Sequence, residues 1–307
     1  MNDILKPKII IKKLKDCDKN EFTKLWNESH SDHFHNWQKT REEIEKRNKL
    51  YKLSEENSKV AFIDDKQVGF ILTATGEVDG KLVGWNGATA VLKQYRRFGI
   101  ATLLYNEILN DYKQQGIEQA LLDVITINEG AKKLYTKLGF QIKSHHIVLY
   151  STLNEYQNKN HKNLINVNNN NNNEINFNMV LDGFKQYHKL NQPLNTQYQN
   201  LIEIHENLIN IEKNGEIIGF MVYSLTFDKC VILFHQLFLQ DKCNINNEII
   251  TEIFNYFYEK YCIPTNTEKK IYLTMWDLNL NETKFMLQFN DNEFKKDFEY
   301  YSMKLDI

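Results

Sequence analysis

The stretch "YRRFGIATLLYNEIL" (residues 95–109) decides the fold of the first half of this chain. An arginine pair, Arg96 and Arg97, and a single glycine, Gly99, stand directly before an amphipathic helical pattern. The N-terminus of a helix carries backbone N–H groups without intrahelical partners, and the aligned peptide dipoles add partial positive charge there. We therefore expect the helix that begins after Gly99 to bind phosphate groups at its start.

The residues of this loop suit a pyrophosphate. Gly99 lets the backbone approach a ligand closely, and Ala101 keeps the first helical turn uncrowded. Arg96 and Arg97 can offer forked donors to phosphate oxygens. The loop lacks the Gly-Lys-Ser/Thr of a Walker A loop and the spaced glycines of the dinucleotide fingerprint, so a nucleotide triphosphatase or a dehydrogenase is not favoured. The loop alone leaves open the alternative of a solvated arginine pair before an ordinary surface helix.

Around this loop, residues 1–150 alternate between strand-like and helix-like hydrophobic periodicity. We predict strands at 8–14, on both sides of the turn 64–66, and at 84–92, 119–126 and 140–150, with helices near 18–29, 39–49, 99–116 and 128–138. The expected fold class is α/β (α+β), with a mixed, largely antiparallel sheet flanked by helices.

The rest of the chain suggests a duplication. Residues 151–176 contain an asparagine-rich tract with too little apolar surface to order, which predicts a linker. Beyond it, "NGEIIGFMVYS" (214–224) resembles "DKQVGFILTAT" (65–75). Further strands are expected at 230–239, 270–278 and 298–305, with helices at 247–261 and near 280–289. We therefore predict a tandem pair of domains, 1–150 and 177–307.

Composition excludes several classes of protein. The length of 307 residues allows two ordinary domains, and the net charge of −2 favours neither nucleic acid nor an anionic membrane as partner. Apolar runs are too short for a membrane helix or a signal peptide, so we expect a cytoplasmic protein. The cysteines are scattered, which argues against a disulfide framework and a zinc cluster; they are Cys17, Cys230, Cys243 and Cys262.

Arginine is rare in this chain. Only four of the 38 basic residues are arginine, and the second half has none. Two adjacent arginines in one loop suggest a ligand that lysine would hold less well.

Two motifs resemble those of the GNAT N-acetyltransferase superfamily. "VLKQYRRFGIATLL" is similar to its Arg/Gln-x-x-Gly-x-Gly/Ala signature, with Arg96, Gly99 and Ala101 at the matching positions. "NEGAKKLYTKLGF" is similar to the following motif; the matching residues are Asn128, Ala131, Tyr135, Gly139 and Phe140. The resemblance covers about residues 8–150. The chain departs from the superfamily at Lys93 and Gln94, often proline and an acidic residue, and at Arg97 and Phe98, often Gly-Lys.

The resemblance implies acetyl-CoA as donor and a role for each matched residue. The backbone of Val91 and Leu92 would pair with the pantetheine arm, and a backbone N–H near Val91 would hold the developing oxyanion. The pyrophosphate would be cradled by Arg96, Arg97, Phe98, Gly99, Ile100, Ala101 and Thr102. Asn128 would contact the cofactor, and Tyr135 would protonate the departing thiolate as general acid.

Several residues keep an alternative explanation. Tyr135 falls on the apolar face of its helix and is otherwise a core residue, and Asn128 is otherwise a helix cap. The histidines His30, His33 and His35 match no common zinc spacing, and nearby Trp37 is a candidate for lining the acceptor site. Glu77 and Asp79 are candidate bases, although a polar hairpin turn explains them equally simply.

The second half lacks the phosphate loop. In "LQDKCNINNEII" there is no glycine or arginine, and Asp241 and Glu248 would repel a pyrophosphate. We expect a degenerate GNAT-like domain that either completes the acceptor pocket or serves only as a structural partner.

The leading functional prediction is an N-acetyltransferase acting on a small primary amine. The alternatives are a non-catalytic acyl-CoA sensor or scaffold, and a protein N-terminal or lysine acetyltransferase. The general base and the oligomeric state are left open by the sequence.

Overall fold

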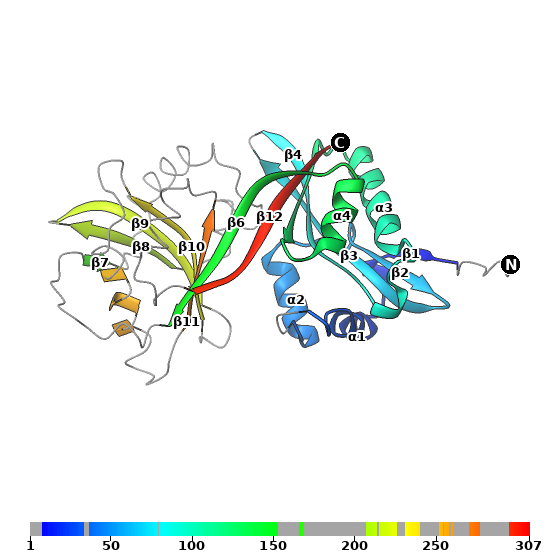
Figure 1. Cartoon of the computed structure of the whole chain (residues 1–307), viewed down its shortest axis with the longest axis horizontal. Coiled ribbons are helices and arrows are strands. Elements are labelled where there is room, and N and C mark those ends of the chain that lie inside the picture. Colours follow the sequence, from blue (N-terminus) through cyan, green and yellow to red (C-terminus); the bar gives the residue numbers. More distant parts are fainter. Residues whose placement is uncertain are drawn as a thin grey trace. The chain divides into compact units, whose positions relative to one another are not determined.

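Two compact units make up the chain in the computed structural model (Figure 1). Unit 1 comprises Met1–Val124, Asn128–Lys143 and Ser302–Ile307, and unit 2 comprises Ile125–Ile127 and Ser144–Tyr301. The structure describes residues 8–33, 37–78, 80–152, 166–168, 207–213, 215–225, 231–239, 252–253, 255–257, 259–260, 270–276 and 295–307.

Unit 1 contains the helices and strands predicted from the first half of the chain and two short 3₁₀ helices, although the last predicted strand belongs to this unit only as far as Lys143. They are β1 (Ile10–Lys13), the short 3₁₀ helix η1 (Leu14–Asp16), α1 (Lys19–Ser29), α2 (Arg41–Leu50), β2 (Lys59–Ile63), β3 (Lys66–Val78), β4 (Lys81–Val91), a second 3₁₀ helix η2 (Lys93–Tyr95), α3 (Ile100–Gln114), β5 (Gln119–Ile125), α4 (Glu129–Lys137) and the start of β6 (Gln141–Thr152). The predicted bounds are correct to within a few residues.

The sheet is mixed, as predicted. Its strands follow the order β1-β2-β3-β4-β5, then β12 (Lys295–Asp306) and β6. The strands β1 to β4 pair antiparallel, whereas β4 and β5 pair in parallel. This parallel pair makes the sheet mixed rather than purely antiparallel. Helix α3 connects the two strands as a crossover, and a crossover returns the chain in the same direction.

Helices cover both faces of this sheet. Phe22 and Trp26 of α1 pack against Phe70 of β3, with ring centroids 5.1 and 5.5 Å apart. On the opposite face Tyr112 of α3 lies so close to Gly84 of β4 that an added Cβ would come within 2.1 Å of its ring. Because side chains alternate along a strand, α1 and α2 share one face, and α3 and α4 share the other.

Unit 2 is described mainly by its strands. They are β7 (Asn166–Asn168), β8 (Asn207–Lys213), β9 (Glu216–Leu225), β10 (Val231–Leu239) and β11 (Lys270–Trp276), which pairs with β6. The predicted strands at 214–224, 230–239 and 270–278 are thus confirmed, and described residues between 252 and 260 are helical. The helix predicted near 280–289 lies outside the described residues.

The tract predicted to be a linker contains strand residues. Strand β6 extends to Thr152, and β7 pairs antiparallel with β8. Composition missed this because the partner of β7 lies in a distant part of the sequence and supplies the backbone hydrogen bonds.

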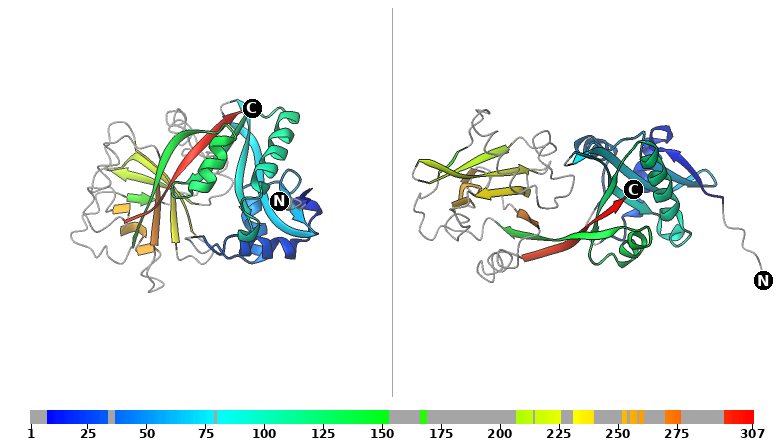
Figure 2. Two further views of the ribbon diagram at one scale, coloured as in Figure 1. Left: turned by 45° about the vertical axis from the view of Figure 1, so that its right-hand side comes forward. Right: turned by 90° about the horizontal axis from the view of Figure 1, so that it is seen from above.

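The last strand brings the end of the chain into unit 1. Strand β12 lies between β5 and β6, and Figure 2 shows β6 and β12 side by side in both views. The Ile307 N–H donates to the Glu118 carbonyl over 2.9 Å. The predicted second domain, 177–307, therefore ends in residues that cluster with unit 1.

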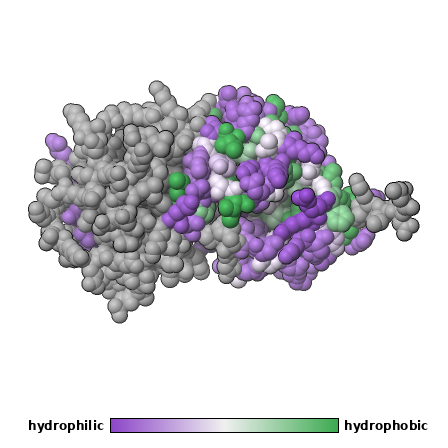
Figure 3. Space-filling model, in the orientation of Figure 1, coloured by the Kyte–Doolittle hydropathy of each residue, from purple (hydrophilic) through white to green (hydrophobic). Residues whose placement is uncertain are grey.

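Hydrophilic side chains predominate on the face of unit 1 shown in Figure 3, with scattered hydrophobic ones between them. No helix among the described residues is long and apolar enough to cross a membrane.

Candidate active site

Strands β4 and β5 stop pairing halfway along β4. Within the described residues their parallel pairing runs from Val83 to Asn86 on β4 and from Gln119 to Leu122 on β5. Beyond this point β4 continues along β3 as far as Val91. Among the residues that the structure describes, the backbone edge of β4 from Gly87 to Val91 therefore has no partner strand on the β5 side.

A β-bulge at Gly87 marks the same point. The register with β3 shifts between Asn86 and Ala88, so Gly87 is an extra residue on β4. Residues 86 and 89 would face opposite sides of a regular strand, and the bulge turns both toward α3 and α4. The hydroxyl of Thr89 accordingly donates to the side-chain oxygen of Asn86 over 3.0 Å.

These two side chains belong to a half-buried polar cluster that includes two buried tyrosines. The amide of Asn86 donates to the hydroxyl of Tyr105 on α3. The rings of Tyr105 and Tyr135 meet edge to face with centroids 5.3 Å apart. Burial raises the pKa of Tyr135, and hydrogen bonds with Tyr105, Thr89 and Asn86 oppose this rise. The structure thus places Tyr135 as a protonated phenol beside the point where β4 and β5 part.

Helix α3 begins without a side-chain cap. Asp18, Thr40 and Asn128 cap α1, α2 and α4 by accepting backbone N–H groups of the first turn. The residue before α3 is Gly99, which has a φ of 82° and no side chain. Its carbonyl accepts the N–H of Leu103 over 3.0 Å. Within the residues that the structure describes, the preceding N–H groups at 100–102 have no partner.

The space above this helix start is open. A Cβ added to Gly99 would meet no atom within 4 Å. A bound phosphate needs free N–H groups, positive charge and open space. The start of α3 offers three such N–H groups and the positive end of the helix dipole, so these residues fit the pyrophosphate of an acyl-CoA.

Arg96 is engaged within unit 1. Its guanidinium forms two bonds to the carboxylate of Asp32, of 2.6 and 2.8 Å. It also donates to the carbonyls of Ser29 over 3.2 Å and Val91 over 3.0 Å. The guanidinium holds the pKa of the Asp32 carboxyl below its usual value. The side chain of Arg96 therefore ties the loop to the end of α1.

Arg97 has the opposite character. Its side chain is exposed, and within the described residues no hydrogen bond or ion pair involves it. Its φ of 72° lies in the left-handed region, which is uncommon for a residue with a side chain. Both arginines were predicted to donate to phosphate oxygens. Of the two, Arg97 is the one whose guanidinium stays available for a ligand.

Residues 12–140 match the model of the Acetyltransferase (GNAT) family. This part of the chain is a GNAT acetyltransferase domain. Among curated proteins, the chain is similar to N-alpha-acetyltransferase 30 of Schizosaccharomyces pombe, with 34% identity over 86 residues, 28% of this chain and 57% of the relative. It is also similar to N-alpha-acetyltransferase MAK3 of Arabidopsis thaliana, with 33% identity over 81 residues, 26% of this chain and 43% of the relative. The chain thus spans about half the length of the curated relatives it matches.

Solved structures share the fold at low sequence identity. The GCN5-related N-acetyltransferase from Sphaerobacter thermophilus has a TM-score of 0.69 and 9% identity, covering 97% of this chain and 95% of that one. A tandem GNAT protein from the clavulanic acid biosynthesis pathway has a TM-score of 0.67 and 8% identity, covering 97% and 98%. These likenesses show the GNAT-like α/β fold that was predicted.

The backbone groups of Val91 and Leu92, predicted to contact the pantetheine arm, differ in their partners. Val91 lies on the part of β4 without a β5 partner, although its carbonyl accepts from Arg96. The Leu92 N–H donates to Val68 O over 2.9 Å, and the Leu92 carbonyl accepts from Tyr95 over 2.8 Å. Both backbone groups of Leu92 have partners in the protein, so we keep only Val91 for this contact.

The remaining predicted residues fall in several places. Asn128 caps α4, accepting the Ala131 N–H over 3.1 Å as expected. His30 and Trp37 stack with centroids 5.7 Å apart on the α1 face, and Trp26 Nε1 donates to the Trp37 carbonyl over 2.9 Å. Glu77 lies near the β3–β4 hairpin turn, remote from Asn86. Phe98 and Leu103 are half-exposed beside the loop.

Some predictions lie outside the described residues; they concern His35, Asp79, Cys230, Asp241, Cys243, Glu248 and Cys262. Within the described part, no group of three or more His, Cys, Asp or Glu is arranged to hold a metal ion. Cys17 is a buried free thiol, and burial raises its pKa to about 11.

Sequence reasoning missed Asp123 on β5. Asp123 follows Leu122, the last residue of β5 paired with β4, and faces the side of α1 and α2 because Leu122 pairs with Asn86 on the α3 side. Burial raises its pKa to about 7, while a hydrogen bond from Ser302 lowers it. The available signal was one acidic residue in the apolar strand "QALLDVIT".

Arg47 was also missed. Its guanidinium donates to the carbonyl of the bulge residue Gly87 over 2.7 Å and lies between Trp26 and Tyr51, 5.3 and 5.1 Å from their ring centroids. Burial lowers the pKa of Arg47, and its Nη1 is enclosed without a hydrogen bond in the described structure. This contact holds the bulge from the α2 side.

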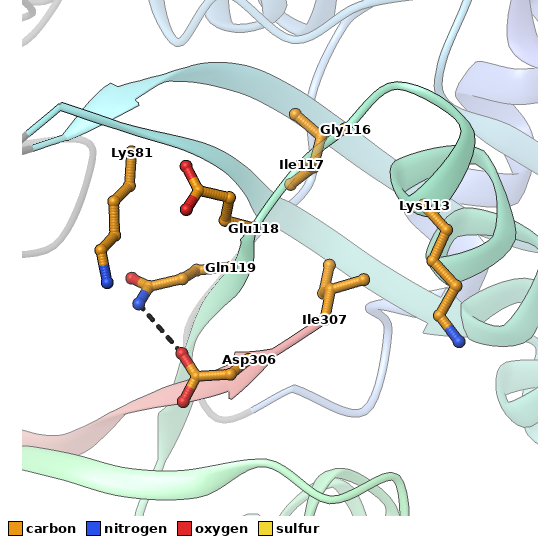
Figure 4. A pocket seen from close by; sticks show the side chains of 8 residues that line it. All are labelled: Lys81, Lys113, Gly116, Ile117, Glu118, Gln119, Asp306 and Ile307. Carbon is orange, nitrogen blue, oxygen red and sulfur yellow. Dashed lines mark hydrogen bonds between the residues drawn. The ribbon is translucent and has the colours of Figure 1, made fainter.

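A surface pocket of about 530 Å³ lies at the other end of β4 (Figure 4). It is lined by Lys81, Lys113, Gly116, Ile117, Glu118, Gln119, Asp306 and Ile307. Because Lys81 begins β4 and Val91 ends it, this pocket is remote from the tyrosine cluster.

Proposed function

We propose that the protein is an acetyl-CoA-dependent N-acetyltransferase whose acceptor is the α-amino group at a protein N-terminus. The observation that carries this proposal is the convergence of three features on the carboxyl-end half of β4. They are the uncapped start of α3, the edge of β4 that β5 leaves unpaired, and the polar cluster around the buried Tyr135.

The loop would hold the donor. The free N–H groups at the start of α3 and the Arg97 guanidinium would bind the pyrophosphate, and the Val91 backbone would pair with the pantetheine arm. Arg96 would act indirectly, since its bonds to Asp32 and Val91 fix the path of the loop. When bound, acetyl-CoA supplies an acetyl group activated as a thioester.

Tyr135 would be the general acid. Its raised pKa keeps the phenol protonated at neutral pH, and Asn86 and Thr89 orient the hydroxyl. Thiolate leaves more readily when an acid delivers a proton to the sulfur, and such proton transfers contribute about 10²- to 10⁴-fold to rates.

Asp123 would be the general base. An amine is protonated near neutral pH and must lose a proton to become a nucleophile. A carboxyl with a pKa of about 7 is ionised in part at that pH and basic enough to accept the proton. Asp123 and Tyr135 lie on opposite faces of the sheet, so the acceptor would approach from the α1 side while the donor sulfur leaves toward α3.

The choice of acceptor rests on the curated relatives. Both are named N-alpha-acetyltransferases, which favours transfer to a protein N-terminus over transfer to a small amine. The small-molecule acceptor stays the competing possibility.

The test uses the full chain, acetyl-CoA, and peptides that differ only at the N-terminus. One peptide series carries a free α-amine, a second is N-formylated and retains an internal lysine, and a panel of small amines replaces the peptides in a third set. Release of free thiol and the mass of the product are measured.

We expect acetylation of the free α-amine series alone. Acetylation confined to lysine or to a small amine would overturn the choice of acceptor. Tight acetyl-CoA binding without turnover on any amine would instead favour a sensor. Tyr135→Phe and Asp123→Asn should each reduce turnover without weakening CoA binding.

A further inference from the structure

Strand β12 supplies the one hydrogen bond made to the side chain of Asp123 within the described residues. Ser302 Oγ on β12 donates to Asp123 Oδ1 over 2.5 Å, although 179 residues separate the two in sequence. Ser302 is buried, with 8% of its surface exposed.

Three other contacts place β12 in a defined register along β5. Gln119 Nε2 donates to Asp306 Oδ1 over 2.9 Å, a bond drawn in Figure 4. The backbone N–H groups of Ile307 and Thr126 donate to the carbonyls of Glu118 and Glu299, each over 2.9 Å. In every pair one residue number rises as the other falls, so β12 runs antiparallel to β5 and sets Ser302 opposite Asp123.

We propose that Ser302 is a positioning residue for the general base, so that the far C-terminal strand completes the catalytic site of the N-terminal GNAT domain. This inference rests on the proposed function, because it requires Asp123 to accept the proton of the acceptor amine. By fixing Oδ1, the Ser302 hydroxyl leaves Oδ2 to take that proton. It also stabilises the ionised carboxylate, since a hydroxyl donor favours the charged form of its acceptor.

The surroundings of Asp123 give this hydroxyl its influence. On the same face of β5 lie Gln119 and Leu121, and on the adjoining β4 lies Trp85, none of them ionisable near neutral pH. On the same face of β12 lie Lys304 and Asp306, which pair with each other over 3.0 Å. Burial and the Ser302 bond are the two influences on the Asp123 pKa, and they act in opposite directions.

The consequence concerns pH dependence. Loss of the Ser302 hydroxyl removes the influence that lowers the pKa of Asp123, so the carboxyl ionises at higher pH. The acidic limb of the kcat/KM profile should move up by about 0.5–1 pH unit, which makes the enzyme about three- to tenfold slower below the limb. Above the limb the rate should change much less.

The experiment compares the wild type with Ser302→Ala, Ser302→Cys and Ser302→Thr in the full chain. Cysteine keeps nearly the volume of serine and donates weakly, while threonine keeps the hydroxyl and suits a strand. Ser144→Ala is the matched control, because Ser144 is also buried and its hydroxyl lies 2.6 Å from His146 Nε2. Acetylation is measured from pH 5 to 9, and the Asp123 carboxyl is titrated directly by ¹³C NMR.

We expect Ser302→Ala and Ser302→Cys to raise both the kinetic limb and the NMR pKa of Asp123, while Ser302→Thr and Ser144→Ala retain the wild-type values. If Ser302→Ala does not fold, Ser302→Cys decides the question. Wild-type pH profiles in both Ser302→Ala and Ser302→Cys, with Asp123→Asn inactive, would overturn the role of Ser302 and leave the proposed function standing. Full activity in Asp123→Asn would instead overturn the base assignment, and the role of Ser302 with it.

Discussion

Replacing Arg96 with lysine should destabilise the free protein before it affects the cofactor. The guanidinium makes four bonds, two to Asp32 and one each to the carbonyls of Ser29 and Val91. A single ammonium can keep the ion pair but cannot keep the fork and both carbonyl bonds. The end of α1 and the end of β4 would therefore lose their common tie.

The structure sets the expected size of this effect. The Arg96 and Asp32 side chains are 40% and 36% exposed, so solvent screens the ion pair, and loss of its second bond costs at most about 0.5 kcal/mol. Two lost hydrogen bonds to carbonyls add about 1 kcal/mol in total. We expect Arg96→Lys to lower the free energy of unfolding by about 1–1.5 kcal/mol, or the melting temperature by about 3–5 °C.

The assay is thermal unfolding with and without CoA, together with the dissociation constant for CoA. Arg97→Lys is the matched control: it should leave the melting temperature of the free protein unchanged and weaken CoA binding about three- to tenfold. Asp32→Asn leaves the Ser29 and Val91 carbonyl bonds in place, so it should cost only about 0.5 kcal/mol, and the double variant should lose less than the sum of the two. An Arg96→Lys protein with unchanged stability but weaker CoA binding than Arg97→Lys would refute the reasoning, because the fork would then serve the ligand.

Three further changes test other parts of the structure. Tyr135→Phe should lower kcat by about 10²-fold and leave the KM for acetyl-CoA unchanged, measured by thiol release. An equal fall of the rate at saturating and at limiting acetyl-CoA would show that the chemical step, and not donor binding, is affected. Gly84→Ala should cost about 3 kcal/mol in urea unfolding, since its Cβ would lie 2.1 Å from the buried Tyr112 ring, whereas Gly130→Ala in α4 meets nothing nearer than 3.7 Å and should stabilise by about 0.5 kcal/mol. Burial lowers the pKa of His30 from 6.5 to about 4. As the pH drops from 6.5 to about 4, His30 therefore takes up a proton in the unfolded chain but not in the folded one, and the free energy of unfolding falls. His30→Gln should remove up to about 1.4 kcal/mol per pH unit of that fall, and an unchanged slope would contradict the assignment.

Local features of the sequence determined most of the elements in unit 1. Hydrophobic periodicity predicted α1 to α4 and the strands between them, because a helix or strand face is encoded within a few turns or residues. The start of α3 was predictable at Gly99, and the Asn128 cap of α4 follows from contacts three residues apart. The family motifs also placed Tyr135 on the helix where the structure has it.

The bulge on β4 is a feature that the local sequence pattern did not predict. Asn86 and Thr89 share a face of the sheet only because Gly87 interrupts the alternation of side chains along β4. The residue types at these positions do not predict that interruption. The partner of Arg96 is likewise 64 residues away, so the arginine pair looked like two equivalent phosphate donors in the sequence.

The amino-acid sequence by itself determined the mixed α/β character of the GNAT domain, the start of α3 at Gly99 and the place of Tyr135 on α4. The tertiary structure alone decided that Arg96 pairs with Asp32 while Arg97 is exposed, that burial raises the pKa of Asp123, and that β12 reaches the Asp123 carboxyl. The physical reason is distance along the chain. Caps and periodicity act over a few residues, whereas the environment of Asp123 depends on a strand almost 180 residues away, whose register is set by the whole of the intervening fold.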